Sequence, residues 1–221
     1  MVQFNYFRGD ATDWKPPDFG NFWVEMAGDI KWYESMYESR ISMHRQLQEW
    51  IAEVEKNDGA LNGIADFGCG LGVGYSDIYE KKEYIGIDIS QENINWCNKN
   101  RDNKLHKYLC QDFISLPLGK KMDLVFSQGT IDNVYDMDEF IKSMVASSKK
   151  WIYLTAYRGW FPDLTEHEYA YSYKHHCFYN NISPARIKDI LLSLGCKDIR
   201  IEPAKTDNPN IPYETRVIAR V

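Results

Sequence analysis

Residues 64–74 read Ile-Ala-Asp-Phe-Gly-Cys-Gly-Leu-Gly-Val-Gly, and they contain the features that decide the fold. The first four residues form a short, largely apolar run, which predicts a buried strand. The glycines that follow predict a tight turn, because a residue without a Cβ atom lets the backbone bend sharply and lets a ligand approach it closely. We therefore expect a strand, a glycine-rich turn and a ligand-binding site where the two meet.

The same alternation of short apolar runs and polar stretches continues to the end of the chain. Strands are predicted at residues 64–67, 84–88, 107–110, 123–127, 151–155, 199–202 and 215–221, and helices at 91–100, 137–147 and 184–194. Strands that alternate with helices indicate right-handed βαβ units and a mostly parallel sheet. Upstream, apolar residues at helical spacing in 21–56 predict one or two amphipathic helices, which end at Asn57-Asp58-Gly59.

Composition restricts the classes of protein that fit. The chain has 221 residues, 44% of them hydrophobic, and its net charge of −6 argues against non-specific binding to nucleic acid or anionic membranes. No apolar run is long enough to span a bilayer, and the N-terminus lacks the pattern of a secretory signal. We expect a cytoplasmic protein, monomeric or homodimeric, with a small-molecule substrate as its partner.

The cysteines and histidines do not predict a metal site or a disulfide framework. The five cysteines are scattered, and no two form a C-x-x-C pair, which is typical of reduced thiols. The sequence His175-His176-Cys177 is the one cluster of metal-ligand residue types. Adjacent residues of an extended segment point to opposite faces, so these side chains would not converge on one ion.

An acidic residue completes the nucleotide-binding pattern. Asp88 ends the second predicted strand, 20 residues after Gly68. An acid at this place can accept hydrogen bonds from the two hydroxyl groups of a ribose. Either a nicotinamide dinucleotide or an adenosyl cofactor would fit this much of the pattern.

Three details favour S-adenosylmethionine. The glycines do not close a G-x-G-x-x-G motif, because Val73 or Tyr75 stands where its third glycine belongs. Asp66 precedes the turn, and its carboxylate would repel a pyrophosphate but would attract an ammonium group. Asp112 and Phe113 end the third strand, where an acid can accept a hydrogen bond from an adenine amino group. The ammonium and sulfonium of S-adenosylmethionine are both positively charged.

On these residues the chain resembles the class I S-adenosylmethionine-dependent methyltransferases, over about residues 60–221. The resemblance implies an α/β fold, a three-layer sandwich with a seven-stranded, mostly parallel sheet whose last strand, here 215–221, is antiparallel. It divides the chain into an N-terminal helical cap, residues 1–58, and a methyltransferase domain, residues 59–221. Residues 157–179 would be an aromatic lid inserted into that domain.

The resemblance also implies which residues hold the cofactor's methionine and ribose parts. Gly68, Cys69 and Gly70 would contact the methionine moiety through backbone groups. Asp88 would hold the ribose, and Asp66 would lie near the ammonium group.

The adenine and the sulfonium would meet the next segments of the chain. Ile89 would pack on the adenine, and Asp112 and Phe113 would contact its edge. Ser127 and Gln128, after the fourth strand, would form the floor near the sulfonium. The product would be S-adenosylhomocysteine.

The turn after the fourth strand lacks a sequence signature, and this absence helps to predict the class of methyl acceptor. Family members that methylate planar nitrogens carry an Asn/Asp-Pro-Pro-Tyr/Phe signature there, whereas residues 127–132 read Ser-Gln-Gly-Thr-Ile-Asp. This difference favours hydroxyls, carboxylates and aliphatic amines. We expect in-line transfer to a hydroxyl or amine of a small molecule, such as a sugar or a polar amine.

The segment 157–179 is unusually aromatic, with eight aromatic rings in 23 residues. Such rings can stack on a planar substrate or enclose an alkylammonium group. Tyr157, Trp160 and Tyr173, together with Tyr33 of the N-terminal helices, are therefore candidate substrate contacts. The alternative is that the rings pack the segment onto the sheet or form a dimer contact.

Charged and titratable residues supply the candidate catalytic groups. His175 and His176 are candidate bases for transfer to oxygen, because a histidine titrates near neutral pH. Asp132 could bind an amine or cap the following helix. Arg40 could pair with the carboxylate of the cofactor, and its alternative is a solvated helix face.

Three other functions are compatible with the sequence. A protein or RNA methyltransferase would use the same cofactor site. A non-catalytic subunit that binds S-adenosylmethionine would explain the lack of a certain base. A nicotinamide-dependent oxidoreductase would need the glycine turn to accept a pyrophosphate despite Asp66.

Overall fold

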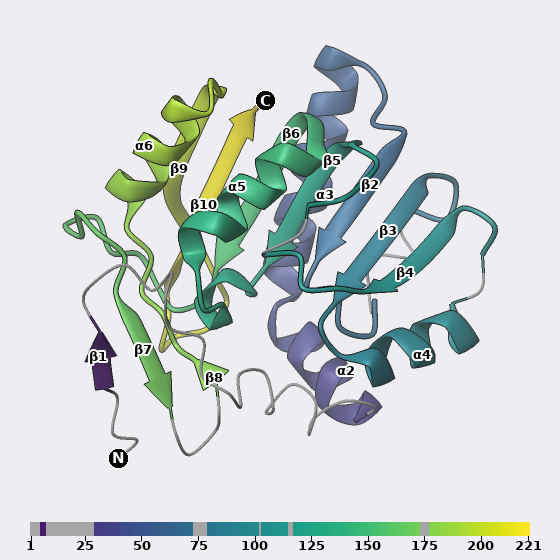
Figure 1. Cartoon of the computed structure of the whole chain (residues 1–221), viewed down its shortest axis with the longest axis horizontal. Helices are drawn as coiled ribbons and strands as arrows, with labels where there is room; N and C mark the ends of the chain where they lie inside the picture. Colours follow the sequence, from purple (N-terminus) through teal and green to yellow (C-terminus); the bar gives the residue numbers. More distant parts are fainter. Residues whose placement is uncertain (1–4, 8–28, 73–78, 102, 115–116, 173–176) are drawn as a thin grey trace.

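The first predicted strand, β2 (Gly63–Phe67), lies near the middle of a seven-stranded sheet in the computed structural model (Figure 1). The structure describes residues 5–7, 29–72, 79–101, 103–114, 117–172 and 177–221. All five residues of β2 are buried, and the strand pairs in parallel with β3 (Glu83–Asp88) and β5 (Met122–Gln128). Burial on both faces explains why β2 reads as an almost continuous apolar run.

The sheet has the order β4-β3-β2-β5-β6-β10-β9. Its remaining strands are β4 (His106–Cys110), β6 (Ser148–Ala156), β9 (Lys197–Lys205) and β10 (Tyr213–Arg220). The last strand, β10, runs antiparallel to both of its neighbours, β6 and β9. All seven predicted strands belong to this sheet, so the predicted fold class is confirmed.

Helices cover both faces of the sheet and make the three layers. On one face α5 (Met137–Ser147) packs against β5 and β6, and α6 (Pro184–Ser193) packs against α5 and β9, in the core that also holds Ala65 and Phe67. On the other face α3 (Ile41–Asp58) and α4 (Gln91–Asn100) pack against Ile64. Successive side chains of a strand point to opposite faces, so one short strand contributes to both cores.

The N-terminal helical region divides at Arg40 into α2 (Ile30–Ser39) and α3. The α3 residues Leu47, Trp50 and Ile51 are buried in the core on the sheet. The predicted boundary between the helical cap and the methyltransferase domain, at residue 58, coincides with the end of α3. However, α3 packs on the sheet and so belongs to one layer of the sandwich. Among the described residues before Gly59, those of α2 and the first turn of α3 lie at the strand ends.

A small antiparallel sheet, which the sequence did not predict, joins two strands of the aromatic segment 157–179 to a strand near the N-terminus. It joins β1 (Asn5–Phe7), β7 (Tyr169–Ser172) and β8 (Cys177–Phe178). Tyr171 and Phe178 are buried in the same core as α5 and α6. These rings therefore pack the segment onto the sandwich, which is the alternative considered for them.

Two further observations apply to the described residues. None of the helices there is both long enough and apolar enough to cross a membrane. Across the same part of the chain, no three His, Cys, Asp or Glu side chains gather as a metal site would require.

Candidate active site

A cavity of about 450 Å³ lies at the carboxyl ends of the parallel strands. This edge is where α/β sheets bind ligands, and the volume is typical of small-molecule sites. The turn after β2 and the end of β3 line one part of it, α2 forms another, and the β9–β10 connection closes the far side. The cavity thus combines the predicted cofactor residues with segments that are distant in the sequence.

The glycine turn is closed on two sides by neighbouring side chains. Gly68 and Gly70 have positive φ angles of 84° and 55°. A Cβ atom on Gly68 would lie 2.1 Å from Oγ1 of Thr130, and one on Gly70 would lie 2.6 Å from the ring of Tyr33. Only glycine fits at either position, and both glycines line the cavity.

Replacing Gly68 with alanine is expected to lower the free energy of unfolding by about 2–3 kcal/mol, because it adds a clash with Thr130 to the cost of a positive φ. Gly59 offers a matched control, since its φ is 85° and a Cβ there would meet nothing within 4 Å. Alanine at position 59 should cost only about 1 kcal/mol. Urea unfolding of both variants measures the difference, and equal losses would contradict the close packing of the turn.

Asp88 holds the turn from the neighbouring strand. One of its carboxylate oxygens accepts a hydrogen bond from the Gly70 amide, and the other accepts one from the Ser90 amide, both at 2.9 Å. Burial raises the pKa of Asp88, while these amide bonds oppose the shift. A carboxylate has about four lone-pair sites. The Asn93 side chain and the Ile89 backbone also act on this carboxylate, and Asp88 lines the cavity beside the glycine turn.

Tyr33 of α2 covers the glycine turn. Its hydroxyl accepts a hydrogen bond of 2.6 Å from the Asn93 side chain of α4. Burial, followed by the nearby charge of Asp88, raises the pKa of the phenol. The residue predicted as a substrate contact thus lies on the cavity wall beside Gly70 and joins α2 to α4.

Asp66 lies on the cavity wall, and the pKa of its carboxyl group is raised. Its carboxylate accepts a hydrogen bond of 2.8 Å from the Tyr84 hydroxyl. Burial raises the pKa of Asp66 to about 7, with a smaller contribution from the charge of Asp88, and the bond from Tyr84 opposes the shift. Near neutral pH this acid is therefore poised to lose its proton when a cation comes close.

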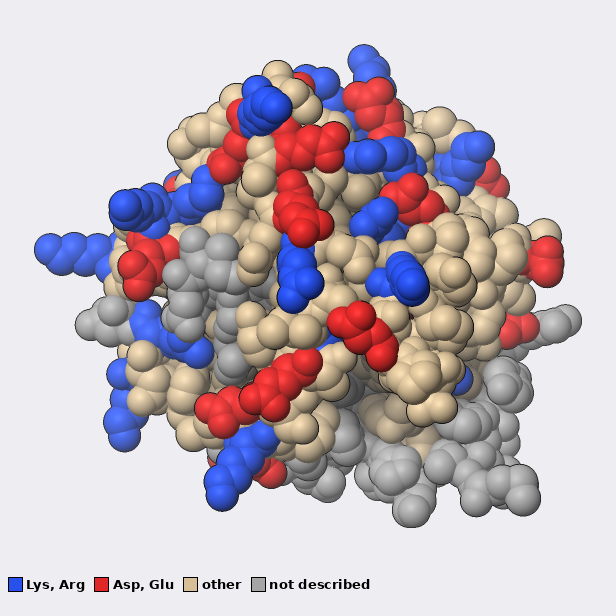
Figure 2. All heavy atoms as spheres, turned by 180° about the vertical axis from the view of Figure 1, so that it is seen from behind, with Lys and Arg blue, Asp and Glu red and all other residues tan. Residues whose placement is uncertain are grey.

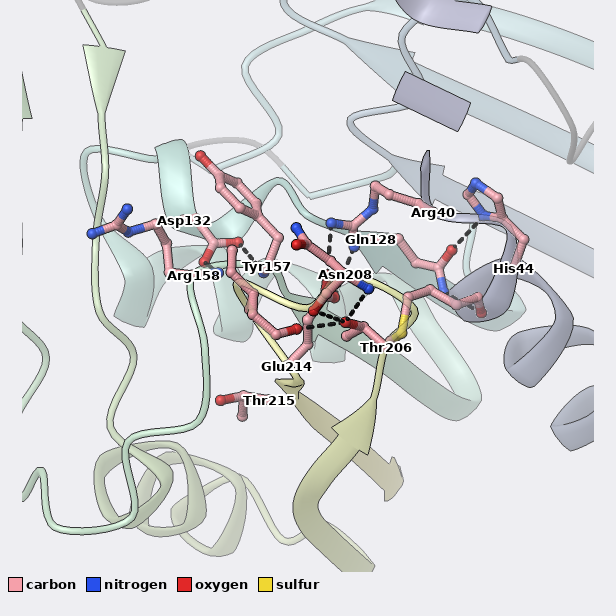
Figure 3. A network of polar contacts seen from close by, with 12 residues as sticks. Arg40, His44, Gln128, Asp132, Tyr157, Arg158, Thr206, Asn208, Glu214 and Thr215 are labelled. Atoms are coloured by element: carbon pink, nitrogen blue, oxygen red, sulfur yellow. Dashed lines mark hydrogen bonds and ion pairs between the residues drawn. The ribbon is translucent and has the colours of Figure 1, made fainter. Parts of the chain in front are cut away.

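Arg40 has a different partner from the predicted cofactor carboxylate. Its two terminal nitrogens bind the two carboxylate oxygens of Glu214 on β10, each at 2.9 Å (Figure 3). The side chains are only 16% and 6% exposed. The guanidinium also lies over the ring of Tyr157, 5.9 Å from its centroid. The chain itself thus supplies a carboxylate for Arg40, which also lines the cavity, and the predicted contact with the cofactor stays a prediction.

The sequence reasoning missed His44, which also lines the cavity. It lies in the first turn of α3, and its Nδ1 is 2.9 Å from Oε1 of Gln128 (Figure 3). Its ring stacks on Tyr37, with centroids 4.3 Å apart and an angle of 15° between the planes. The only signal in the sequence was its place four residues after Arg40, which puts both on one helix face.

Several predicted cofactor residues meet at the cavity, and others do not. Ile89, Phe113, Gln128 and Cys69 line it. Asp112 is not on its wall, because one carboxylate oxygen accepts a bond from the Tyr135 hydroxyl and the other accepts one from a backbone amide.

Ser127 and Asp132 have structural roles in place of the predicted ones. The Ser127 hydroxyl is fully buried and donates to the carbonyl of Phe67, so it does not form a cavity floor. The two oxygens of Asp132 accept the backbone amides of Tyr157 and Arg158, each at 3.0 Å. Burial raises the pKa of Asp132 to about 7. This buried acid shapes the loop after β6, and it neither caps a helix nor faces the cavity.

The remaining predicted residues differ in position. Tyr157 lies on the cavity wall, whereas Trp160 is half-buried elsewhere. Tyr173, His175 and His176 fall outside the described residues. The hypotheses of a base at His175 or His176 and of a substrate contact at Tyr173 therefore stay predictions.

Comparisons with known proteins add two findings. A family model described as a methyltransferase domain matches residues 65–150. No curated protein matches the chain in sequence. The matched segment runs from β2 to the start of β6, and so it contains the glycine turn and Asp88 on the cavity wall.

Solved structures resemble the whole chain in fold at low sequence identity. The Burkholderia thailandensis 1,6-didemethyltoxoflavin-N1-methyltransferase, solved with 1,6-didemethyltoxoflavin and S-adenosylhomocysteine, is 11% identical, with a TM-score of 0.68 over 100% of this chain and 96% of that one. The Synechocystis PCC 6803 magnesium protoporphyrin IX methyltransferase with bound S-adenosylhomocysteine is 17% identical, with a TM-score of 0.61 over 90% and 93%. The Bradyrhizobium japonicum N-methyltransferase NodS is 12% identical, with a TM-score of 0.60 over 92% and 97%.

Proposed function

We propose that this chain, which has the fold of the class I S-adenosylmethionine-dependent methyltransferases and a methyltransferase domain at residues 65–150, transfers a methyl group from S-adenosylmethionine to a hydroxyl or amine of a small molecule. One observation carries the proposal: a single cavity combines the glycine turn and Asp88 with a wall of aromatic and polar residues. The first part suits the methyl donor, and the second suits an acceptor.

The residues of the cofactor side fit S-adenosylmethionine. Asp88 lines the cavity at the end of β3, where it suits the ribose hydroxyls, and Asp66 provides an acid for the ammonium group. Ile89 and Phe113 offer apolar contacts for the adenine. When bound, the cofactor supplies an electrophilic methyl group on a sulfonium. The protein's part is to orient the acceptor and exclude water.

Size and charge support a small acceptor. The toxoflavin and porphyrin enzymes named above act on small molecules, as their names state. On the face in Figure 2 acidic and basic side chains are interspersed. A nucleic-acid surface is instead expected to concentrate Lys and Arg, so that face gives no support to an RNA substrate.

Two measurements test the proposed function. Calorimetry should show saturable binding of S-adenosylhomocysteine by the purified chain. Incubation with methyl-labelled S-adenosylmethionine and a crude cell extract should then place the label in the soluble or lipid fraction. Label in precipitable protein or RNA would overturn the choice of acceptor, and absence of binding would overturn the function itself.

Binding of S-adenosylhomocysteine near pH 7 is expected to release about half a proton, because a bound ammonium lowers the pKa of Asp66 from about 7. Titration calorimetry in two buffers with different ionisation enthalpies measures this release. The Asp66→Asn variant is the control and should show no dependence on the buffer. A buffer-independent enthalpy in the natural chain would contradict the proposed place of the ammonium group.

A further inference from the structure

Tyr157, the first residue after β6, is held on the cavity wall by its backbone, its ring and its hydroxyl. Its backbone amide donates to a carboxylate oxygen of Asp132 at 3.0 Å (Figure 3). The guanidinium of Arg40 lies over its ring, and its hydroxyl accepts a hydrogen bond of 3.2 Å from Nδ2 of Asn133. Tyr157 and Asn133, which meet at the hydroxyl, both line the cavity. The hydroxyl is therefore fixed at the edge of the cavity.

The contacts of Asn133 determine the direction of its hydrogen bond to Tyr157. The same Nδ2 atom also donates to the backbone carbonyl of Phe178. The reverse orientation of the amide would put two acceptor oxygens, those of Asn133 and Phe178, against each other, so the amide nitrogen is the atom that faces Tyr157. An amide nitrogen only donates, so the phenol oxygen accepts and the hydrogen of the hydroxyl must point elsewhere.

The Tyr157 hydroxyl thus has a hydrogen to donate to a bound molecule. Within the ranges that the structure describes, no group accepts this hydrogen. Burial, and after it the charge of Asp132, raises the pKa of the phenol, so the hydroxyl keeps its hydrogen near neutral pH. The positive charge of Arg40 over the ring attracts its electrons and so strengthens the hydroxyl as a donor.

The loop after β5 joins this donor to the glycine turn. Thr130 of the loop packs against the turn, because a Cβ atom on Gly68 would clash with its side chain. Gly129, the residue before Thr130, packs against Tyr157, since a Cβ atom there would lie 3.4 Å from Cδ1 of the ring. A molecule bound at the Tyr157 hydroxyl would therefore share one cavity with a methyl donor bound at the turn.

We propose that Tyr157 determines which acceptor is methylated, by donating its hydroxyl hydrogen to a carbonyl oxygen of an uncharged small molecule. The inference rests on the proposed function and narrows the hydroxyl or amine compound to one that also carries a carbonyl group. Tyr157 takes no part in the transfer itself. It positions the acceptor and discriminates against compounds without the carbonyl, because such a compound leaves the hydroxyl without a partner in a largely buried place.

The groups around Tyr157 favour an uncharged carbonyl compound. Arg40 and Glu214 neutralise each other through two hydrogen bonds, so neither a cation nor an anion would find a full opposite charge there. A hydroxyl at this place would bring a hydrogen that needs a second partner, whereas a carbonyl oxygen only accepts. A carbonyl group is therefore the one that matches a single neutral donor.

The product made by the natural chain tests the class of acceptor. The small-molecule part of a crude cell extract is incubated with the chain and methyl-labelled S-adenosylmethionine, and the labelled compound is purified. Its infrared spectrum should contain the stretching band of a carbonyl group. A labelled compound without a carbonyl group would overturn the inference. Label that mild alkali releases, as from a methyl ester, would also overturn it, because the carbonyl then belongs to the methylated group.

The Tyr157→Phe variant tests the donor, since it removes the hydroxyl and keeps the ring. Initial rates of label transfer are measured across a dilution series of the same extract. The amount of extract that gives the half-maximal rate should rise about 10-fold, because the carbonyl oxygen loses its partner. The maximal rate and the affinity for S-adenosylhomocysteine should change less than about threefold. Tyr213→Phe, at an exposed position of β10, is the matched control and should leave all three quantities unchanged.

The outcomes distinguish this inference from the proposed function. A Tyr157→Phe variant that needs no more extract than the natural chain would overturn the inference, and so would a loss confined to the maximal rate or to the affinity for S-adenosylhomocysteine. Each of these results leaves the proposed function standing. If Tyr157→Phe does not fold, the carbonyl test still decides, because it uses the natural chain alone. A natural chain that neither binds S-adenosylhomocysteine nor transfers label would overturn both.

Discussion

Replacing Asp88 with alanine is expected to weaken the binding of S-adenosylhomocysteine by about 100-fold or more. A hydrogen bond to a charged group contributes about 1.5–3 kcal/mol, so two ribose hydroxyls on one carboxylate amount to about 3–6 kcal/mol. About 1.4 kcal/mol corresponds to a factor of ten in affinity. Titration calorimetry measures the change directly, and an affinity within threefold of the natural chain would contradict the assignment of Asp88 to the ribose.

The loss of affinity in Asp88→Ala must be distinguished from an effect of the substitution on the structure of the glycine turn. Without its carboxylate, the buried amides of Gly70 and Ser90 lose their acceptors, so the melting temperature should also fall. Affinity is therefore compared well below the melting temperature of the variant. Asp58→Ala, at the exposed end of α3, is the control and should change neither affinity nor stability. Asp88→Asn keeps one acceptor oxygen and should give an intermediate affinity.

The cofactor side of the cavity could be predicted from the sequence because its geometry is local to the sheet. The turn after β2 and Asp88 at the end of β3 belong to adjacent parallel strands. Parallel strands bring their carboxyl ends to one edge, so these residues must meet wherever the rest of the chain goes. The same reasoning identified Ile89, which follows Asp88 directly.

The acceptor side could not be predicted because its contacts join distant parts of the chain. Arg40 meets Glu214 across 174 positions, and His44 meets Gln128 across 84. Nothing in the spacing of residues along a helix says which strand end it will face. The sequence therefore indicated that the N-terminal helices contribute to the site but not through which partners.

The polar residues that were predicted for the site but do not line the cavity have other partners, for a common physical reason. Ser127 and Gln128 are neighbours on a strand, so their side chains point to opposite faces and only one can reach the cavity. Asp132 was considered for binding an amine or capping a helix, yet backbone amides use both of its oxygens. Buried backbone groups need hydrogen-bond partners, as ligands do. The sequence does not show whether a polar side chain will bind a backbone group or a ligand.

The small sheet was missed because its strands are very short. β1 has three residues and β8 has two, which is too few to show an alternating pattern. The aromatic residues of 157–179 suggested a substrate platform. Tyr169, Tyr171 and Phe178 instead belong to the core, while Tyr157 and Tyr179 reach the cavity.

Replacing Arg40 with methionine is expected to lower the free energy of unfolding by about 3–5 kcal/mol. The variant leaves Glu214, only 6% exposed, as a buried charge without its cation. Burial already raises the pKa of Glu214, and Arg40 opposes that shift. Without Arg40 the pKa rises further, so the folded state of the variant holds its proton more tightly than the unfolded chain does. Part of the lost stability should therefore return as the pH falls from about 7 to about 5.

A double variant distinguishes the unpaired charge from lost packing. Arg40→Met with Glu214→Leu removes both charges and keeps apolar volume, so most of the stability lost in Arg40→Met should return. The double variant should also lack the recovery of stability that Arg40→Met shows as the pH falls. The exposed pair Lys142–Glu139 on α5 provides the control, since its side chains are 43% and 47% exposed. Lys142→Met should cost less than about 0.5 kcal/mol. Urea unfolding of the four chains gives these values. If Arg40→Met costs no more than Lys142→Met, the ion pair does not stabilise the junction of α2 and α3 against β10.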